Sequence, residues 1–485
     1  MPYLRLMKRE FLINILFLLA INGLIKPFYL FGIDRVIQNR LSEGTYGLYF
    51  ALFNFTFLFQ IINDFGIQYF NSRNISQHGH LLEKHFPGIL MLKAGLGLLF
   101  FIVLTLVAIV LGYWPQYQWL LWMIAFNQLL SSLVLYLRSN VSGLGLYRHD
   151  SLLSVADRLL LILLCGYLLW FSPWRESFRI EWFVMAQTFS LLATALFAFS
   201  ILKKQIAKLR FRFNPAFLWL ILLKSAPYAL AVLLMTIYNR IDGVMIERML
   251  PDGKIEADIY ASAYRLFEAG NMLGFLFSAL LLPIFSRMLK QEAPLEELTW
   301  FSFRMVAAGA LTLIIGLVFY RTPVMVALYD NGSAYSGQVL LYLMLGFFAV
   351  CGTYIFGTLL VANDSLKQLN RIFACSLLLN VALNTWLIPV FKAEGAAMAT
   401  CITQFGVLLA ELVLCRRLLN LSFDHITFIR LLAFTLLLLA TGVALRLYWP
   451  FVWWSGFFIG LAAGLVLAFG LRLIHLKALF EKVRA

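Results

Sequence analysis

The stretch Ala94–Gly112, AGLGLLFFIVLTLVAIVLG, decides the class of fold. It contains no charged residue, and about 20 helical residues rising 1.5 Å each cross a hydrocarbon core of about 30 Å. Strands of a membrane barrel would instead alternate apolar and polar residues over about ten positions, so a helix is favoured. Similar runs recur along the whole chain. The sequence therefore predicts an all-α integral membrane protein.

The composition agrees with this assignment. Of the 485 residues, 62% are hydrophobic and 13% are charged, and the mean hydropathy is +0.84. Soluble domains have roughly 45–50% apolar and about 25% charged residues, so a water-soluble fold is excluded. We expect about fourteen transmembrane helices. Their approximate ranges are residues 11–31, 46–70, 88–112, 117–137, 152–172, 182–202, 216–239, 259–285, 301–320, 336–360, 372–391, 396–415, 428–448 and 452–471.

The basic residues predict the orientation of these spans. Most of the 39 Lys and Arg residues fall on the side of the N-terminus, with a dense cluster in residues 203–212, so both termini are expected on the cytoplasmic side of the membrane. The first apolar run is followed by no cleavage site and is expected to stay as an anchor. The net charge of +15 then reflects topology and attraction to membrane lipids. No basic stretch is interleaved with aromatic residues on a soluble module, so nucleic acid is not an expected partner.

A short internal repeat suggests how the spans are grouped. The segment Ile33–Arg40, IDRVIQNR, aligns without a gap on Ile241–Arg248, IDGVMIER. The offset is six spans, an even number, so the copies enter the membrane in the same direction. Chance similarity is the alternative for so short a match. The repeat predicts two pseudo-symmetric six-helix bundles with a cavity between them, suited to alternating access. The expected divisions are a bundle at 1–202, a basic linker at 203–215, a bundle at 216–415, and two further helices with a tail at 416–485.

Six short motifs, distributed over nearly the whole chain, carry a family resemblance. They are GTYG at 44–47, NDFGI at 63–67, YRLFE at 264–268, LPIF at 282–285, NVALN at 380–384 and GAAMAT at 395–400. Together they resemble the multidrug/oligosaccharidyl-lipid/polysaccharide (MOP) exporter superfamily. The chain is most similar to its Wzx-type polysaccharide flippases, which are related to lipid II flippases and to MATE exporters.

The resemblance implies a flippase rather than an enzyme. Its substrate would be an undecaprenyl-pyrophosphate-linked oligosaccharide, moved from the cytoplasmic to the periplasmic leaflet for cell-surface polysaccharide biosynthesis. A glycan polymerase and assembly proteins would be its partners, and no cofactor is implied. In the lipid II relatives, basic residues on spans one, two and eight serve the headgroup. Lys26 and Arg265 match two of these places, whereas span two here carries no Lys or Arg.

Ionisable residues inside spans are the candidates for the substrate site. Each costs about 2.5–3.5 kcal/mol on insertion scales, so it should face a wet cavity, pair, or reach the interface. Lys26, Lys224 and Arg265 are the deepest basic candidates, and cations suit a pyrophosphate. The alternative is that Lys26 reaches the interface and that Arg265 pairs with Glu268 three residues on.

Four acidic positions complete the candidates in or beside the spans. Asp34 and Asp64 are candidate substrate residues, as is Glu268 beside Arg265, and Asp34 is the repeat partner of Asp242.

A second set of polar residues suggests an ion site. Asn380 and Asn384 are four residues apart and share one helix face. With Asp242 and Thr400 they match a cation site on spans seven, eleven and twelve of the lipid II relatives, which implies a sodium site. Hydrogen bonding between helices is the alternative role of these amides. Coupling to Na⁺ or H⁺ is thus an expectation of the resemblance.

Two other functions compete with the flippase. A cation-coupled multidrug exporter of the MATE branch would need an acidic cavity, against which the deep basic residues argue. A membrane-embedded glycan polymerase would be expected to carry catalytic residues on a substantial loop, whereas the longest loops here have about 20 residues. No GxxxxGK[ST] motif is present, so any energy source would be a gradient or a substrate sink.

Overall fold

The fold confirms the helical prediction. The computed structural model describes residues 21–67, 82–144, 146–173, 175–203, 215–449 and 452–474. Within these ranges the chain forms helices and turns and no strand. Nine helices in the described part are long and apolar enough to cross a membrane, and one of them, α14 (Leu366–Leu419), contains two of the expected spans. The chain divides into two compact units, Met1–Glu247 and Arg248–Ala485, and each is treated by itself. The domain boundaries expected from the repeat stay a prediction.

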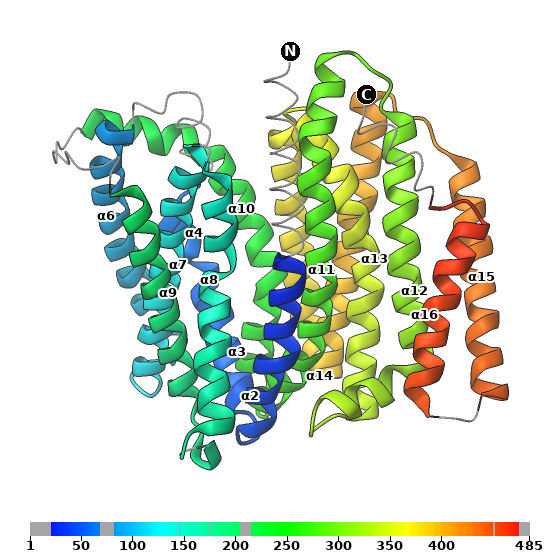
Figure 1. The fold of residues 1–485 in the computed structure, drawn as a ribbon, viewed down its shortest axis with the longest axis horizontal. Helices are drawn as coiled ribbons and strands as arrows, with labels where there is room; N and C mark the ends of the chain where they lie inside the picture. The colour runs from blue at the N-terminus through cyan, green and yellow to red at the C-terminus, as the bar shows by residue number, and fades with distance from the viewer. Residues whose placement is uncertain are drawn as a thin grey trace. The chain divides into compact units, whose positions relative to one another are not determined.

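The first unit is built around α7, which packs against α3, α8 and α9 (Figure 1). Its elements are η1 (Tyr29–Asp34), α2 (Arg35–Arg40), α3 (Thr45–Leu58), α4 (Gln60–Asp64), α6 (Leu82–Val110), α7 (Gln118–Gly143), α8 (Tyr147–Gly166), η3 (Tyr167–Phe171), η4 (Arg175–Ser177), α9 (Ile180–Leu202) and α10 (Pro215–Met249). The last turn of α10 passes into the second unit.

The described part of the first span is a helix with a wide turn in it. Residues 21–28 are α-helical, η1 is a π-helical segment, and α2 continues the helix. Pro27 lies just before η1, and a proline removes one backbone hydrogen bond and clashes with the preceding turn, which favours such a local widening. Residues 11–20 of this span lie outside the described residues.

The second span differs from the continuous helix expected for residues 46–70. It breaks at Phe59, and its second piece, α4, ends at Asp64. Phe65 (φ 48°) and Gly66 (φ 71°) are both left-handed, which terminates the helix. A Cβ on Gly66 would lie 3.2 Å from the carbonyl oxygen of Ser225, so the glycine allows this end to lie against α10. The break therefore places Asp64 at a helix end inside the unit.

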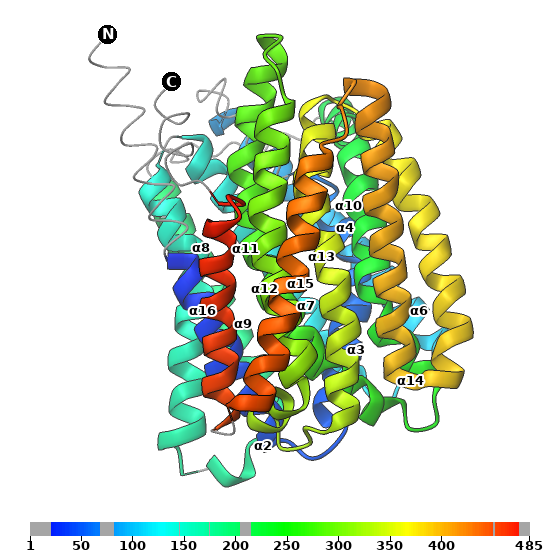
Figure 2. The same ribbon diagram turned by 90° about the vertical axis from the view of Figure 1, so that its right-hand side faces the viewer.

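The second unit is centred on α13, which packs against α11, α12 and α14. Its helices are α11 (Gly253–Lys290), α12 (Glu296–Leu328), α13 (Ala334–Ala362), α14, α15 (His425–Tyr448) and α16 (Trp453–Gly470). Side chains fix two of the helix starts. Ser333 and Ser336 form a capping box before α13, and Asp424 accepts from the Thr427 amide at 3.1 Å before α15. Figures 1 and 2 both show α15 and α16 side by side next to α12.

Helix α14 contains spans eleven and twelve, joined by a turn with almost no loop. Lys392 has φ 54° and ψ −130°, outside helical geometry. Its ammonium group forms ion pairs with Asp252 and with Glu256, the latter at 3.3 Å, and the hydrogen bond to Asp252 lowers the pKa of that carboxyl. A Cβ on Gly395 would lie 2.3 Å from the Leu387 carbonyl oxygen, so only glycine lets the two arms approach this closely. The turn therefore depends on the ion pairs of Lys392 and on the missing side chain at Gly395.

The cores and the outer faces of the two units are both apolar. Large aromatic side chains fill the interior of the first unit, including Tyr46, Phe50 and Tyr136, each at most 1% exposed. Large apolar side chains also cover the outside, as at Val110 and Leu378, which are 83% and 72% exposed. In water such surfaces would mark interfaces, whereas hydrocarbon accepts them without cost. This distribution is that of a multi-pass membrane protein.

The turn in α14 can be tested by adding one methyl group. Gly395→Ala should lower the melting temperature of the purified protein by several degrees, because its Cβ must displace backbone and overpacking costs about 1–3 kcal/mol. Gly406→Ala in the same helix is the control, since its Cβ meets nothing closer than 3.8 Å. Equal melting temperatures for the two variants in detergent would contradict this account of the turn.

Candidate functional site

Asp34 is buried and held by two phenols. It ends the π-helical segment η1 and is 0% exposed. The Tyr46 hydroxyl donates to Oδ2 at 2.6 Å, and the Tyr29 hydroxyl donates to Oδ1 at 3.4 Å. The Arg158 guanidinium lies 4.7 Å from the centre of the Tyr29 ring. The carboxylate thus sits within a built network in the first unit, where its contacts order the end of the first span.

Asp64 belongs to a buried ion pair that the sequence analysis missed. Its partner is Lys93 of α6, whose Nζ lies 3.0 Å from Asp64 Oδ1. Lys93 also donates to Ser132 Oγ at 2.7 Å and to the Asn63 carbonyl at 3.4 Å, and it is 5% exposed. The signal was present, because Lys93 is the single charged residue between positions 86 and 112. Span two has no basic residue of its own, and its Asp64 pairs with a lysine of span three.

This ion pair gives a stability prediction. Lys93→Met should lower the yield and melting temperature of folded protein strongly, because breaking a buried pair leaves one uncompensated charge at a cost of about 3–5 kcal/mol. The double variant Lys93→Met/Asp64→Leu removes both charges and should recover much of the loss. If the double variant melts no higher than Lys93→Met, the pair is not what holds this part of the first unit.

Arg265 is a second buried cation, on α11 of the second unit. It is 8% exposed, and its Nη1 lies 2.8 Å from Oε2 of Glu268, the i,i+3 contact named as the alternative. Its neighbours along the helix are aromatic, with the rings of Tyr264 and Phe267 centred 5.5 Å apart. The guanidinium is therefore desolvated, paired, and positioned by a carboxylate.

The other two basic candidates are less well defined. Lys26 is half-buried on the described part of the first span, which belongs to the first unit and not to the unit of Arg265. Lys224 lies in α10, but its side chain is outside the described residues. The joint binding of one substrate by Lys26, Lys224 and Arg265 stays a prediction.

The proposed ion ligands divide between the two units. Asp242, on α10, is 1% exposed in the first unit. The next residue, Gly243, lies against α3, since a Cβ there would be 2.8 Å from both Asn54 Nδ2 and Phe50 Cε1. Asp242 is thus fixed where α10 crosses α3 closely.

The other three ligands lie in the second unit and are almost fully buried. Asn380 and Asn384 are 0% exposed, and Thr400 is 4% exposed. Asn384 Nδ2 donates to Asn380 Oδ1 at 3.1 Å, which confirms their shared helix face. Hard cations are bound by oxygen ligands, and these three residues offer amide and hydroxyl oxygens but no carboxylate. No group of three His, Cys, Asp or Glu residues with metal-binding geometry occurs in the described ranges. A sodium site formed by these residues together with Asp242 stays a prediction.

Glu411 is a buried carboxyl that sequence reasoning passed over. It lies in the second arm of α14, is 0% exposed, and approaches α13 so closely that a Cβ on Gly357 would be 2.8 Å from Oε1. Neither of its carboxyl oxygens has a hydrogen-bond partner of normal geometry among the described residues, and the nearby Thr353 hydroxyl also lacks one. A negative charge here would be severely desolvated.

The environment of Glu411 predicts an asymmetry between two substitutions. Glu411→Gln keeps the shape and removes the charge, so the melting temperature should stay the same or rise. Glu411→Lys introduces a longer cation without a partner and should strongly reduce folded protein in the membrane. A loss of folded protein in Glu411→Gln as large as in Glu411→Lys would mean that the ionised carboxylate itself stabilises the unit.

Apolar helices that bury ion pairs are the architecture of a multi-pass membrane protein. Residues 11–289, more than half of the chain, match the family described as "Polysaccharide biosynthesis protein". The chain belongs to this family, and the resemblance to proteins of polysaccharide biosynthesis inferred from its motifs is confirmed. None of the curated proteins compared with the chain matches it by sequence.

Solved structures share the fold at low sequence identity. The lipid II flippase MurJ, in an inward closed conformation, matches with a TM-score of 0.69 and 15% identity over 95% of this chain and 100% of its own. An inward-facing MATE-family multidrug resistance transporter of the MOP superfamily matches with a TM-score of 0.57 and 13% identity, over 81% of this chain and 94% of its own. A MOP superfamily transporter from Pyrococcus furiosus matches with a TM-score of 0.53 and 13% identity, over 84% of this chain and 94% of its own. These likenesses establish the fold.

Proposed function

We propose that this transporter flips a polyprenyl-pyrophosphate-linked oligosaccharide from the cytoplasmic to the periplasmic leaflet of the bacterial inner membrane. The observation that carries the proposal is Arg265, a desolvated guanidinium inside a span of a protein of polysaccharide biosynthesis. Such a residue is costly to insert and is expected to have a function. A pyrophosphate headgroup is the part of the substrate that a buried cation would recognise.

The chemistry of the headgroup fits this residue. A pyrophosphate carries at least two negative charges, and a guanidinium can bind it through parallel charge-assisted hydrogen bonds. Glu268 would hold the guanidinium in place in the resting state, at the 2.8 Å contact. The more highly charged pyrophosphate would then compete with Glu268 for Arg265. This exchange keeps the cation paired at each stage, as a low-dielectric environment requires.

The transport cycle we propose is alternating access, driven by a sodium or proton gradient or by the membrane potential. The absence of an ATP-binding motif from the sequence supports a gradient. Both termini would lie in the cytoplasm, following the distribution of Lys and Arg. A glycan polymerase and assembly proteins would use the delivered substrate on the periplasmic side.

Arg265 provides the test. Arg265→Ala should reduce flipping of a fluorescent polyprenyl-pyrophosphate oligosaccharide in proteoliposomes by at least tenfold, with normal amounts of protein in the membrane. Arg265→Lys should keep part of the activity, because it keeps the charge but loses the bidentate geometry. The rate is measured by protection of the labelled glycan from a lectin added outside the vesicles.

Glu268→Gln separates binding from structure. If Arg265 serves only as the partner of Glu268, then Glu268→Gln and Arg265→Ala should reduce transport equally. The proposal expects Glu268→Gln to retain most of the activity, because the cation remains. Wild-type protein that extrudes an amphipathic cation such as ethidium and leaves the lipid-linked glycan in place would overturn the proposal in favour of a multidrug exporter.

A further inference from the structure

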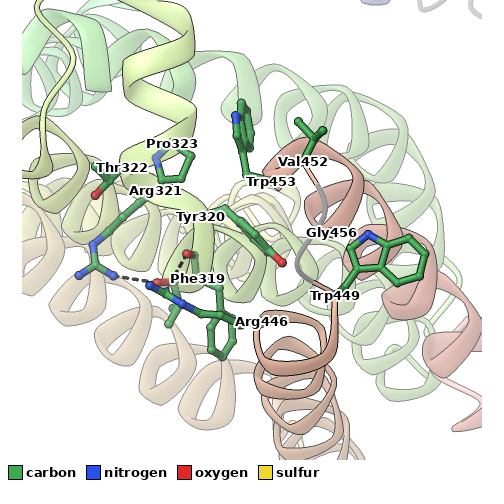
Figure 3. Close-up of a pocket in the computed structure, with 11 residues that line it drawn as sticks. Phe319, Tyr320, Arg321, Thr322, Pro323, Arg446, Trp449, Val452, Trp453 and Gly456 are labelled. Atoms are coloured by element: carbon green, nitrogen blue, oxygen red, sulfur yellow. Dashed lines mark hydrogen bonds between the residues drawn. The ribbon is translucent and has the colours of Figure 1, made fainter.

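The second unit contains a cavity of about 400 Å³ that the transport proposal does not use (Figure 3). It lies where α12 and α15 approach their C-terminal ends and α16 begins. Arg321, Arg446, Trp449 and Trp453 contribute its polar and aromatic lining. All the lining residues belong to the second unit, so the cavity is defined within one compact body.

Two guanidinium groups lie in this cavity without an acidic counter-charge. Arg321 Nη1 donates to the Val318 carbonyl at 2.7 Å, and Arg446 Nη1 donates to the Phe319 carbonyl at 3.2 Å. Figure 3 shows both groups reaching these neighbouring carbonyls of α12. No Asp or Glu lines the cavity, and in the described part of the chain neither arginine forms an ion pair. Adjacent cations repel, so an anion would stabilise the pair.

The geometry of α12 explains the hydrogen bond of Arg446 but gives no structural role to Arg321. Pro323, inside α12, has no amide hydrogen to give to the Phe319 carbonyl four residues earlier, and Arg446 fills that vacancy from α15. Arg321 has no such role, because the carbonyl it contacts lies three residues earlier in its own helix. The Nε of Arg321 is buried and has no hydrogen-bond partner among the residues that the structure describes. The guanidinium of Arg321 therefore has hydrogen-bond donors that the described residues do not use.

The surroundings are those of a membrane interface. Trp449 is 40% exposed, and tryptophan is enriched at the level of lipid headgroups. The residues next to Arg446 along α15, Leu447 and Tyr448, are 68% and 82% exposed. On α16, Phe458 is 61% exposed. A ligand with a charged end in the cavity would thus have apolar helix faces beside it for hydrocarbon chains.

We propose that this cavity binds the phosphate group of an anionic bilayer phospholipid, with its acyl chains along the exposed faces of α15 and α16. Arg321 and Arg446 contact the phosphate oxygens, and the tryptophans pack against the glycerol region. Arginine is suited to phosphate because its donors are arranged as a planar fork. The bound lipid offsets part of the positive charge of the two guanidinium groups and ties α12 to the last two helices. The proposal is independent of which substrate the protein transports.

Lipid binding to the purified full-length protein tests this site. Native mass spectrometry and thermal unfolding in detergent are followed during titration with phosphatidylglycerol, phosphatidylcholine or inorganic phosphate. Wild type should retain phosphatidylglycerol adducts and melt at a higher temperature with it, while phosphatidylcholine and inorganic phosphate have little effect. Arg321→Gln should bind phosphatidylglycerol at least fivefold more weakly. Arg321→Lys keeps the charge and should bind with intermediate affinity.

Two controls make the result specific. Arg417→Gln removes an exposed cation of α14 in the same unit and should bind lipid like wild type. Arg265→Ala should also bind phosphatidylglycerol normally, which separates this site from the transport proposal. Unchanged affinity in the double variant Arg321→Gln/Arg446→Gln would overturn the inference. An equal effect of inorganic phosphate and phosphatidylglycerol would also overturn it, since the site would then recognise a free anion.

Discussion

Hydrocarbon offers no water to a charged or polar group, and this constraint organises the interior of both units. Each buried charge needs a partner supplied by the protein, and the buried acids and bases below have defined contacts, whereas Glu411 has none of normal geometry among the described residues. In the first unit Lys93 joins Asp64, and two tyrosines hold Asp34. In the second unit Arg265 joins Glu268. These contacts fix helix against helix or turn against turn.

The apolar pattern of the sequence was sufficient to predict the helices. Runs of span length are set by bilayer thickness, so each expected span that is described falls on a helix. The break at Phe59 and the turn at Lys392 were not predicted, because backbone angles at single residues depend on what packs against them. The turn needs Asp252 and Glu256, which lie far away in sequence, and no local pattern announces such a contact.

The candidate site was predicted less completely than the fold. Arg265 and its contact with Glu268 follow from helical spacing, since residues three apart meet on one face. Lys93 was missed because a lone lysine in an apolar run does not reveal whether it points to lipid or to an acid on another helix. Glu411 was missed for the same reason, since its burial depends on Gly357 of α13. Contacts between helices belong to the tertiary structure, and a single sequence does not show them directly.

The two arms of α14 meet at one residue outside helical geometry, with Gly395 pressed against Leu387 and Lys392 tied to the start of α11. A connection this short and this well anchored fixes the register of the two arms where they meet. A rearrangement of the second unit therefore cannot slide one arm past the other at the turn. The asparagine pair on one arm and Glu411 on the other belong to helices whose relative height is set at this end.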